Sequence, residues 1–144
     1  MRKLITKATI TFFTNQGNED SIIQSAISFI KHNNNNNVHI DRKRIEDIKT
    51  VLLEAINNSV SFAYPNKQGK VIVSIFIYDN KVLKLQIRDY GCGIEDTEKA
   101  REPLFTTKAG CPGLGLNVME AFSDKFTLKS TVEKGTIVTM EFKV

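Results

Sequence analysis

The sequence has little of what marks a secreted, metal-stapled or membrane-spanning protein. It contains no tryptophan, three prolines and only two cysteines, Cys92 and Cys111, in 144 residues. Two cysteines without histidines at matching spacing do not make a zinc site. No run approaches the roughly 18 consecutive apolar residues of a membrane-spanning helix, and the first residues lack the apolar core of a signal peptide. We therefore expect a cytoplasmic protein with reduced cysteines.

A strong excess of either charge is also missing. Lys and Arg together number 20 and Asp and Glu number 16, which leaves a formal charge of +4. This small excess does not by itself indicate nucleic-acid binding. The cluster Arg42-Lys43-Arg44 is expected in the first turn of a helix, where it could also contact an acidic partner. With 41% apolar residues, the chain is long enough to form one domain over residues 1–144 with a full hydrophobic core.

Hydrophobic periodicity predicts both strands and helices, in an order in which single strands do not alternate with single helices along the chain. Alternating apolar residues predict strands, and apolar residues three and four apart predict helices. A run of five asparagines, 33–37, predicts an exposed loop between the first two helices. The expected strands are 7–13, 70–78, 82–88, 125–131 and 136–144, and the expected helices are 21–31, 42–64 and 114–122. This order is not that of a Rossmann-type βαβ chain. We expect an α/β two-layer sandwich, with helices on one face of a mixed, mostly antiparallel sheet.

Two polar segments stand out within this framework. On the long helix, Glu54 and Asn58 are four residues apart, so their side chains share a face. That face is either plain solvated surface or a carboxylate and an amide presented together to a ligand. After the strand 82–88 comes Asp89-Tyr-Gly-Cys-Gly93. Its glycines allow a ligand to approach the backbone closely, and Asp89 could accept a hydrogen bond from an exocyclic amine.

Two further segments have the chemistry of phosphate contacts. Phe105-Thr-Thr-Lys108 combines two hydroxyls with an ammonium group. Gly113-Leu-Gly115 opens a helix, whose free N–H groups and positive dipole end favour phosphate. It is not a Walker loop, because no Gly-Lys-Ser/Thr follows. Each segment alone is also compatible with a polar loop or an ordinary helix cap.

Taken in order, the four segments resemble those of the GHKL ATPase superfamily, whose nucleotide-binding domain is the Bergerat fold. In that superfamily the first segment is called the N box, which reads ExxxN here, and the second is the first glycine box, DxGxG. The third is the lid, FTTK, and the fourth is the second glycine box, GLGL. The stretch Ala100-Arg-Glu-Pro-Leu-Phe-Thr-Thr-Lys108 looks like the bacterial anti-sigma factor serine kinases, above all those of sporulation. The resemblance covers the whole chain and includes the order of elements.

The resemblance implies a site for ATP or ADP with Mg²⁺ and assigns roles within it. Glu54 would be the catalytic carboxylate that activates the attacking group. Asn58 would hold Mg²⁺, which prefers oxygen ligands, and Asp89 would bind the adenine amino group. The other residues would shape the pocket or contact the nucleotide: Gly91, Gly93, Thr106, Thr107, Lys108, Gly113, Leu114, Gly115 and Thr136.

The resemblance also implies protein partners. Members of this family hold a sigma factor in one nucleotide state and phosphorylate a serine of a STAS-type anti-anti-sigma protein. They form homodimers, for which the N-terminal strand is a candidate interface. Direct contact with nucleic acid or a membrane is not implied.

Three features depart from the family pattern. Phe62 and Ala63 stand where the family commonly has His-Gly, which should change packing more than chemistry. The lid segment 109–112 is short and has no Arg, and the helix 21–31 lacks a basic residue near Ile23, where the family has one that faces the sigma factor. Two alternatives therefore stay open. One is a nucleotide-gated binding module without catalysis, and the other is a histidine-kinase-like ATPase domain.

Overall fold

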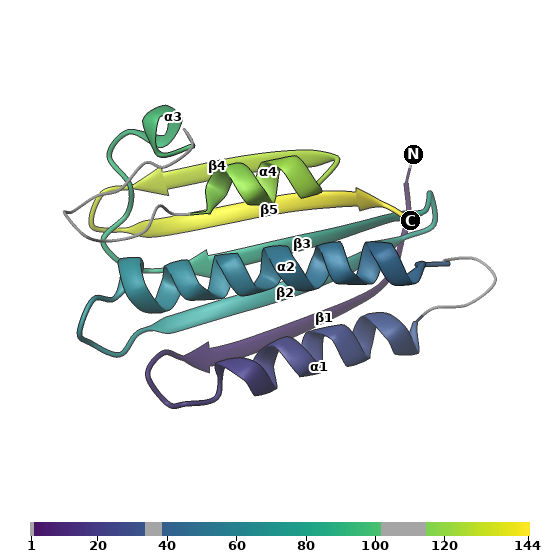
Figure 1. Cartoon of the computed structure of the whole chain (residues 1–144), viewed down its shortest axis with the longest axis horizontal. Coiled ribbons are helices and arrows are strands. Elements are labelled where there is room, and N and C mark those ends of the chain that lie inside the picture. The colour runs from purple at the N-terminus through teal and green to yellow at the C-terminus, as the bar shows by residue number, and fades with distance from the viewer. Residues whose placement is uncertain (1, 34–38, 102–114) are drawn as a thin grey trace.

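The computed structural model describes residues 2–33, 39–101 and 115–144, which form two layers (Figure 1). The strands are β1 (Leu4–Phe13), β2 (Lys70–Tyr78), β3 (Val82–Asp89), β4 (Lys125–Thr131) and β5 (Gly135–Lys143). The helices are α1 (Glu19–His32), α2 (Arg42–Asn58), a π-helical turn η1 (Ser59–Ala63), α3 (Thr97–Ala100) and α4 (Leu116–Phe122). Figure 1 shows α1, α2 and α4 side by side over one face of the sheet.

The strands lie in the order β1-β2-β3-β5-β4, and every pairing between the described strands is antiparallel. The expected two-layer α/β sandwich is confirmed. The expected mixture of strand directions is not found, because short turns join β2 to β3 and β4 to β5, and such turns reverse the chain. In the central β3–β5 pair, Asp89 lies opposite Thr136. The two ends of the sheet are β1 and β4.

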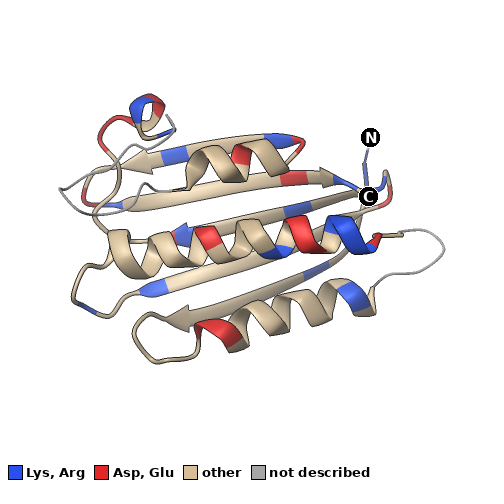
Figure 2. Cartoon of the chain, in the orientation of Figure 1, with Lys and Arg blue, Asp and Glu red and all other residues tan. Residues whose placement is uncertain are grey.

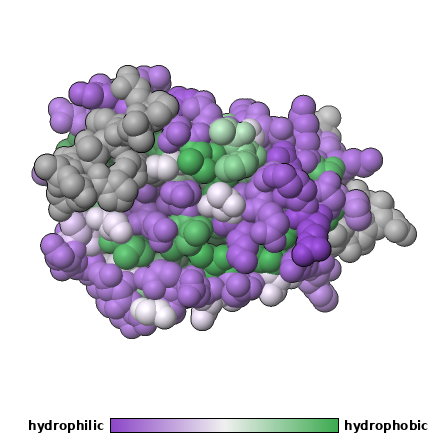
Figure 3. Space-filling model, in the orientation of Figure 1, coloured by the Kyte–Doolittle hydropathy of each residue, from purple (hydrophilic) through white to green (hydrophobic). Residues whose placement is uncertain are grey.

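The hydrophobic core fills the space between the two layers. Alternate residues of the central strands point into it, and Val73, Ile75 and Leu85 are fully buried. The apolar stripe expected on the second helix faces them. Its members are all buried: Ile45, Ile48, Leu52, Ala55, Ile56 and Ala63. The opposite side of the helical layer is mostly hydrophilic, as Figure 3 shows, with apolar atoms visible in a band between the helices.

Several element boundaries differ from the sequence expectation. Strand β1 begins three residues earlier, at Leu4, and α1 begins at Glu19, because an acidic residue is favourable in a first helical turn. The long helix changes at Ser59 from α-helix to the π-helical turn η1. The short helix α3, capped by the Asp96 side chain, was not expected. The asparagines at 34–37 lie outside the described residues. No helix among those described is long and apolar enough to cross a membrane.

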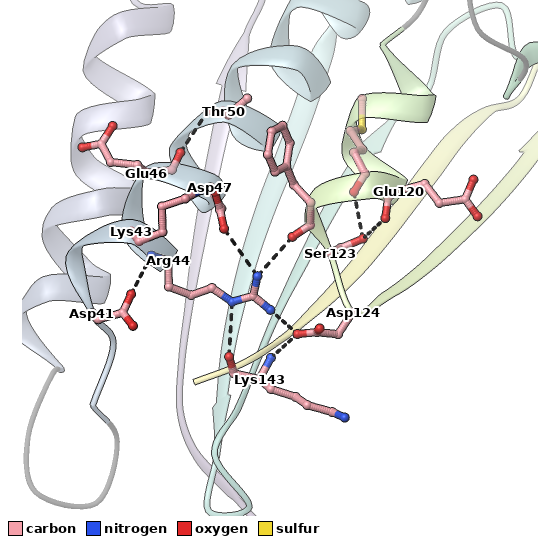
Figure 4. A network of polar contacts seen from close by, with 12 residues as sticks. Asp41, Lys43, Arg44, Glu46, Asp47, Thr50, Glu120, Ser123, Asp124 and Lys143 are labelled. Carbon is pink, nitrogen blue, oxygen red and sulfur yellow. Dashed lines mark hydrogen bonds and ion pairs between the residues drawn. The ribbon is translucent and has the colours of Figure 1, made fainter.

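Arg44 ties the start of α2 to the far ends of α4 and β5 (Figure 4). Its Nε donates to the carbonyl oxygen of Lys143 over 3.2 Å, and its Nη1 donates to that of Phe122 over 3.2 Å. Its Nη2 pairs with the carboxylate of Asp124. The backbone N–H of Arg44 donates to the side chain of Asp41 over 2.8 Å, so Asp41 caps the start of α2. One guanidinium group therefore holds two helices and the last strand together.

We expect Arg44→Ala to lower the free energy of unfolding by about 2–3 kcal/mol, because each of three hydrogen-bond acceptors loses a donor worth roughly 1 kcal/mol. Urea denaturation of the purified variant measures this loss. The matched control is Lys43→Ala, since the Lys43 side chain is 78% exposed and pairs with Asp47 at the surface. The control should lose at most about 0.5 kcal/mol. Equal losses in the two variants would contradict the role given to Arg44.

Candidate functional site

A cavity lies where α2, η1, α4 and the ends of β3 and β5 meet. It is lined by Ala55, Asn58, Ser59, Phe62, Ala63, Ile87, Asp89, Ile94, Leu116, Thr136 and Val138. Most of these residues are apolar, and a few polar groups lie among them, as in many ligand sites. The cavity volume is about 20 Å³, which is room for about one water molecule. A purine ring would therefore enter only after the walls of the cavity move apart.

Asp89 is the buried carboxylate of this cavity and is 9% exposed. It is the last residue of β3, so the strand itself fixes its position. Its Oδ1 accepts hydrogen bonds from the backbone N–H groups of Gly91 (3.0 Å) and Thr136 (3.2 Å). Its Oδ2 has no hydrogen-bond partner among residues 2–33, 39–101 and 115–144. That oxygen can accept a hydrogen bond from an incoming ligand.

Burial raises the pKa of Asp89, and the N–H groups of Gly91 and Thr136 offset this rise only in part. A carboxyl group whose pKa is higher in the folded protein than in the unfolded chain binds its proton more tightly when folded. Ionisation of Asp89 therefore lowers the free energy of unfolding. This loss develops as the pH rises from about 3.9, the pKa in the unfolded chain, through the pKa in the folded protein. A ligand that donates a hydrogen bond to Oδ2 would relieve part of this cost.

The glycines of the DxGxG segment fit against neighbouring backbone. A Cβ atom on Gly91 would overlap the carbonyl oxygen of Ala63, and a Cβ on Gly93 would overlap the backbone of Thr131. Gly93 also has a φ of +75°, which side chains with a Cβ rarely adopt. The N–H of Cys92 donates to the carbonyl oxygen of Ala63 over 3.1 Å. In this structure the two glycines thus let the loop pack between η1 and the β4–β5 hairpin, and neither belongs to the cavity lining.

Thr136 is held by a side chain that sequence reasoning missed. Its hydroxyl lies 2.7 Å from that of Ser130, which accepts a hydrogen bond from the backbone N–H of Ile94 over 2.7 Å. Ser130 lies opposite Thr136 in the β4–β5 register. No motif marks Ser130, and only the register of the hairpin could have indicated it.

A second missed residue, Tyr64, fixes the chain directly after Asp89. Its hydroxyl donates to the carbonyl oxygen of Lys70 over 2.7 Å and accepts from the backbone N–H of Tyr90 over 2.6 Å. The pKa of Tyr64 is raised, chiefly by burial, so the hydroxyl stays protonated and keeps both hydrogen bonds. Tyr64 thereby links the end of η1 to the loop that follows β3.

The helix face that carries Glu54 and Asn58 points toward this site. Asn58 lines the cavity. Glu54 lies one turn earlier and is partly exposed. It faces Gly115 at the start of α4, and a Cβ atom added to Gly115 would overlap the Glu54 carboxylate. Glu54 and Asn58 thus share one helix face, as expected; Asn58 lines the cavity, and Glu54 lies at the start of α4.

Part of the expected site cannot be placed. The lid and most of the second glycine box lie outside the described residues: Thr106, Thr107, Lys108, Gly113 and Leu114. Cys111 lies there too. In the described part of the chain, no group of three or more His, Cys, Asp or Glu side chains could hold a metal ion.

Comparison with known proteins gives a family and several relatives. A family model described as the histidine kinase-like ATPase domain matches residues 18–142. The anti-sigma F factor of Caldanaerobacter subterraneus subsp. tengcongensis is 45% identical over 100 residues, which are 68% of this chain and 69% of that protein. The anti-sigma F factor of Priestia megaterium is 37% identical over 100 residues, which are 67% and 68% of the two chains.

Solved structures of histidine kinases share the fold. The catalytic domain of histidine kinase ThkA matches with a TM-score of 0.57 at 21% identity, over 93% of this chain and 95% of that one. The mycobacterial sensor histidine kinase MprB matches with a TM-score of 0.56 at 18% identity, over 95% and 97% of the two chains. The expected resemblance to GHKL ATPases and to anti-sigma factors is confirmed. The chain belongs to the histidine kinase-like ATPase domain family.

Proposed function

We propose that this protein is an anti-sigma factor that binds ATP or ADP with Mg²⁺ and phosphorylates a serine of a STAS-type anti-anti-sigma partner. The observation that carries the proposal is the buried carboxylate of Asp89, whose Oδ2 has no partner among the described residues of a mostly apolar cavity. The relatives named anti-sigma F factor support the sigma-binding part.

The cavity suits adenine better than guanine. Adenine presents an amino group, which donates hydrogen bonds, where guanine presents a carbonyl oxygen, which only accepts them. Oδ2 of Asp89 would accept from the amino group, and Thr136 lies beside it. Apolar residues such as Ile87, Ile94 and Val138 would contact the faces of the ring. Because these walls exclude water, the hydrogen bond to Asp89 would be stronger than the same bond at the surface.

The phosphates would lie toward Glu54, Asn58 and the start of α4. The amide oxygen of Asn58 fits the hard oxygen ligands that Mg²⁺ takes, with phosphates and water as its other ligands. When bound, Mg²⁺ neutralises phosphate charge. Glu54 would accept the proton of the attacking serine hydroxyl. We assign the phosphate contacts to the rest of the expected set, Thr106, Thr107, Lys108, Gly113, Leu114 and Gly115, with Gly91 and Gly93 shaping the loop behind Asp89.

We also propose that two copies of the chain associate through β1. This strand forms one end of the sheet, so one row of its backbone hydrogen-bonding groups has no neighbour among the described strands. It carries three large apolar side chains at the surface, Leu4 (44% exposed), Ile5 (49%) and Phe13 (49%). A second copy paired along β1 would cover part of these side chains.

We expect Asp89→Asn to weaken ATP and ADP binding about 10- to 100-fold, because a hydrogen bond to a charged group contributes roughly 1.5–3 kcal/mol. Isothermal titration calorimetry with and without Mg²⁺ measures the affinities. Asp79→Asn is the matched control, since Asp79 is exposed in the turn between β2 and β3. The proposal fails if both variants bind ATP as the wild type does.

The same Asp89→Asn variant should be at least as stable as the wild type at pH 7 without nucleotide. It removes a buried charge but keeps an oxygen that accepts from Gly91 and Thr136. The advantage of the variant should shrink as the pH falls toward about 4, because Asp89 then becomes protonated in the wild type. Urea denaturation between pH 4 and 7 tests this. A large loss of stability at pH 7 would mean that the variant loses nucleotide binding by unfolding.

We expect Glu54→Gln to slow phosphoryl transfer by about 10²- to 10⁴-fold, the usual contribution of a general base, with ATP affinity nearly unchanged. The assay follows radiolabelled γ-phosphate from ATP to the cognate STAS protein. Glu46→Gln is the control, because Glu46 is exposed on the same helix, more than two turns away. Wild-type protein that binds ATP but transfers no phosphate would instead favour the binding module without catalysis.

A further inference from the structure

The face of the sheet that lies away from the helices is basic. Alternate residues of each strand point outward, and the strand register sets cations next to one another there. Lys84 and Lys125 flank Glu141, and Arg88 and Lys129 flank Ile137. The helical side differs, because acidic and basic residues are interspersed along its helices (Figure 2).

The acidic residue in this register, Glu141, is already paired. Its Oε1 lies 2.6 Å from Arg2 Nη1, and its Oε2 lies 3.9 Å from Lys125 Nζ. Toward the other end of the same strands, no carboxylate of the described residues forms an ion pair with Arg88, Lys129 or Lys134. These three cations are therefore available to an anionic partner.

The three available cations surround one hollow. The rest of its lining is Asp89, Ser130, Thr131, Gly135, Thr136 and Ile137, and its volume is about 230 Å³. Hydroxyl groups, the side chain of Ile137 and the mostly buried carboxylate of Asp89 thus lie among the positive charges. The hollow is large enough for side chains of a bound peptide. Its three cations outnumber its one carboxylate, Asp89, so its charge favours carboxylates.

We propose that an acidic stretch of a protein partner docks in this hollow, with its carboxylates on Arg88, Lys129 and Lys134. The guanidinium group of Arg88 can hold a carboxylate with two parallel hydrogen bonds. Single-stranded nucleic acid fits less well, because its bases need free aromatic rings on which to stack. The ring of Tyr90 already faces Arg88 at 5.0 Å and Lys70 at 5.2 Å. The hollow shares Asp89 and Thr136 with the proposed nucleotide site, but the proposal requires neither nucleotide binding nor kinase activity.

The test measures binding of fluorescein-labelled octaglutamate by anisotropy at about 50 mM salt, where screening is modest. The wild type is compared with the triple variant Arg88→Gln/Lys129→Gln/Lys134→Gln. A second triple variant, Lys31→Gln/Arg42→Gln/Lys49→Gln, removes the same charge from exposed positions on the helical side. Circular dichroism and ATP titration show whether each variant is folded.

We expect the first triple variant to bind octaglutamate at least about tenfold more weakly, since each exposed ion pair contributes up to roughly 1 kcal/mol. The control should change less than about threefold. Equal losses in the two variants, or no binding by the wild type, would overturn the proposal. Tighter binding of an oligothymidylate of matched charge would identify a nucleic-acid surface instead. A loss of self-association in the first variant, measured by sedimentation, would identify an interface between copies.

Discussion

The pairing of β3 with β5 is the constraint on which the site depends. It sets Asp89 opposite Thr136 at the edge of the core, where the backbone N–H of Thr136 donates to the buried carboxylate. Burial raises the pKa of Asp89, so the folded protein holds a charge that is costly without a ligand. Proteins often retain such destabilising groups at the sites where they bind ligands or catalyse reactions. The close packing of Gly91 against Ala63 and the hydrogen bond from Tyr90 to Tyr64 hold the loop that follows.

Placing the helices on one face of an antiparallel sheet has two consequences. On that face, α2 and α4 pack together, so Glu54 meets Gly115 while Arg44 holds the opposite ends of the two helices. On the other face the strands keep their outward side chains, and Arg88 and Lys129 gather positive charge there. The same two-layer arrangement thus produces a mostly apolar cavity on one side of Asp89 and a basic hollow on the other.

The sequence was sufficient for most of the elements and for the family, because both depend on short-range patterns. The apolar spacing of α2 predicts its buried stripe, and the order of the four polar segments indicates the family. Contacts that depend on strand register, or on where a segment distant in the sequence ends, were not predictable in this way. Ser130 has no motif and meets Thr136 only through the hairpin register. Tyr64 supports Tyr90 only because η1 ends beside β3. The small volume of the cavity depends on how all its walls pack.

The central claim is that Asp89 recognises the amino group of adenine, and a double-mutant cycle with a modified ligand tests it most directly. The affinities of ATP and of purine riboside triphosphate, which lacks the amino group, would be measured for the wild type and for Asp89→Asn. The account predicts that loss of the amino group weakens binding about 10- to 100-fold in the wild type and by much less in the variant. An equal loss in both proteins would contradict it, because the amino group would then contact some other part of the molecule.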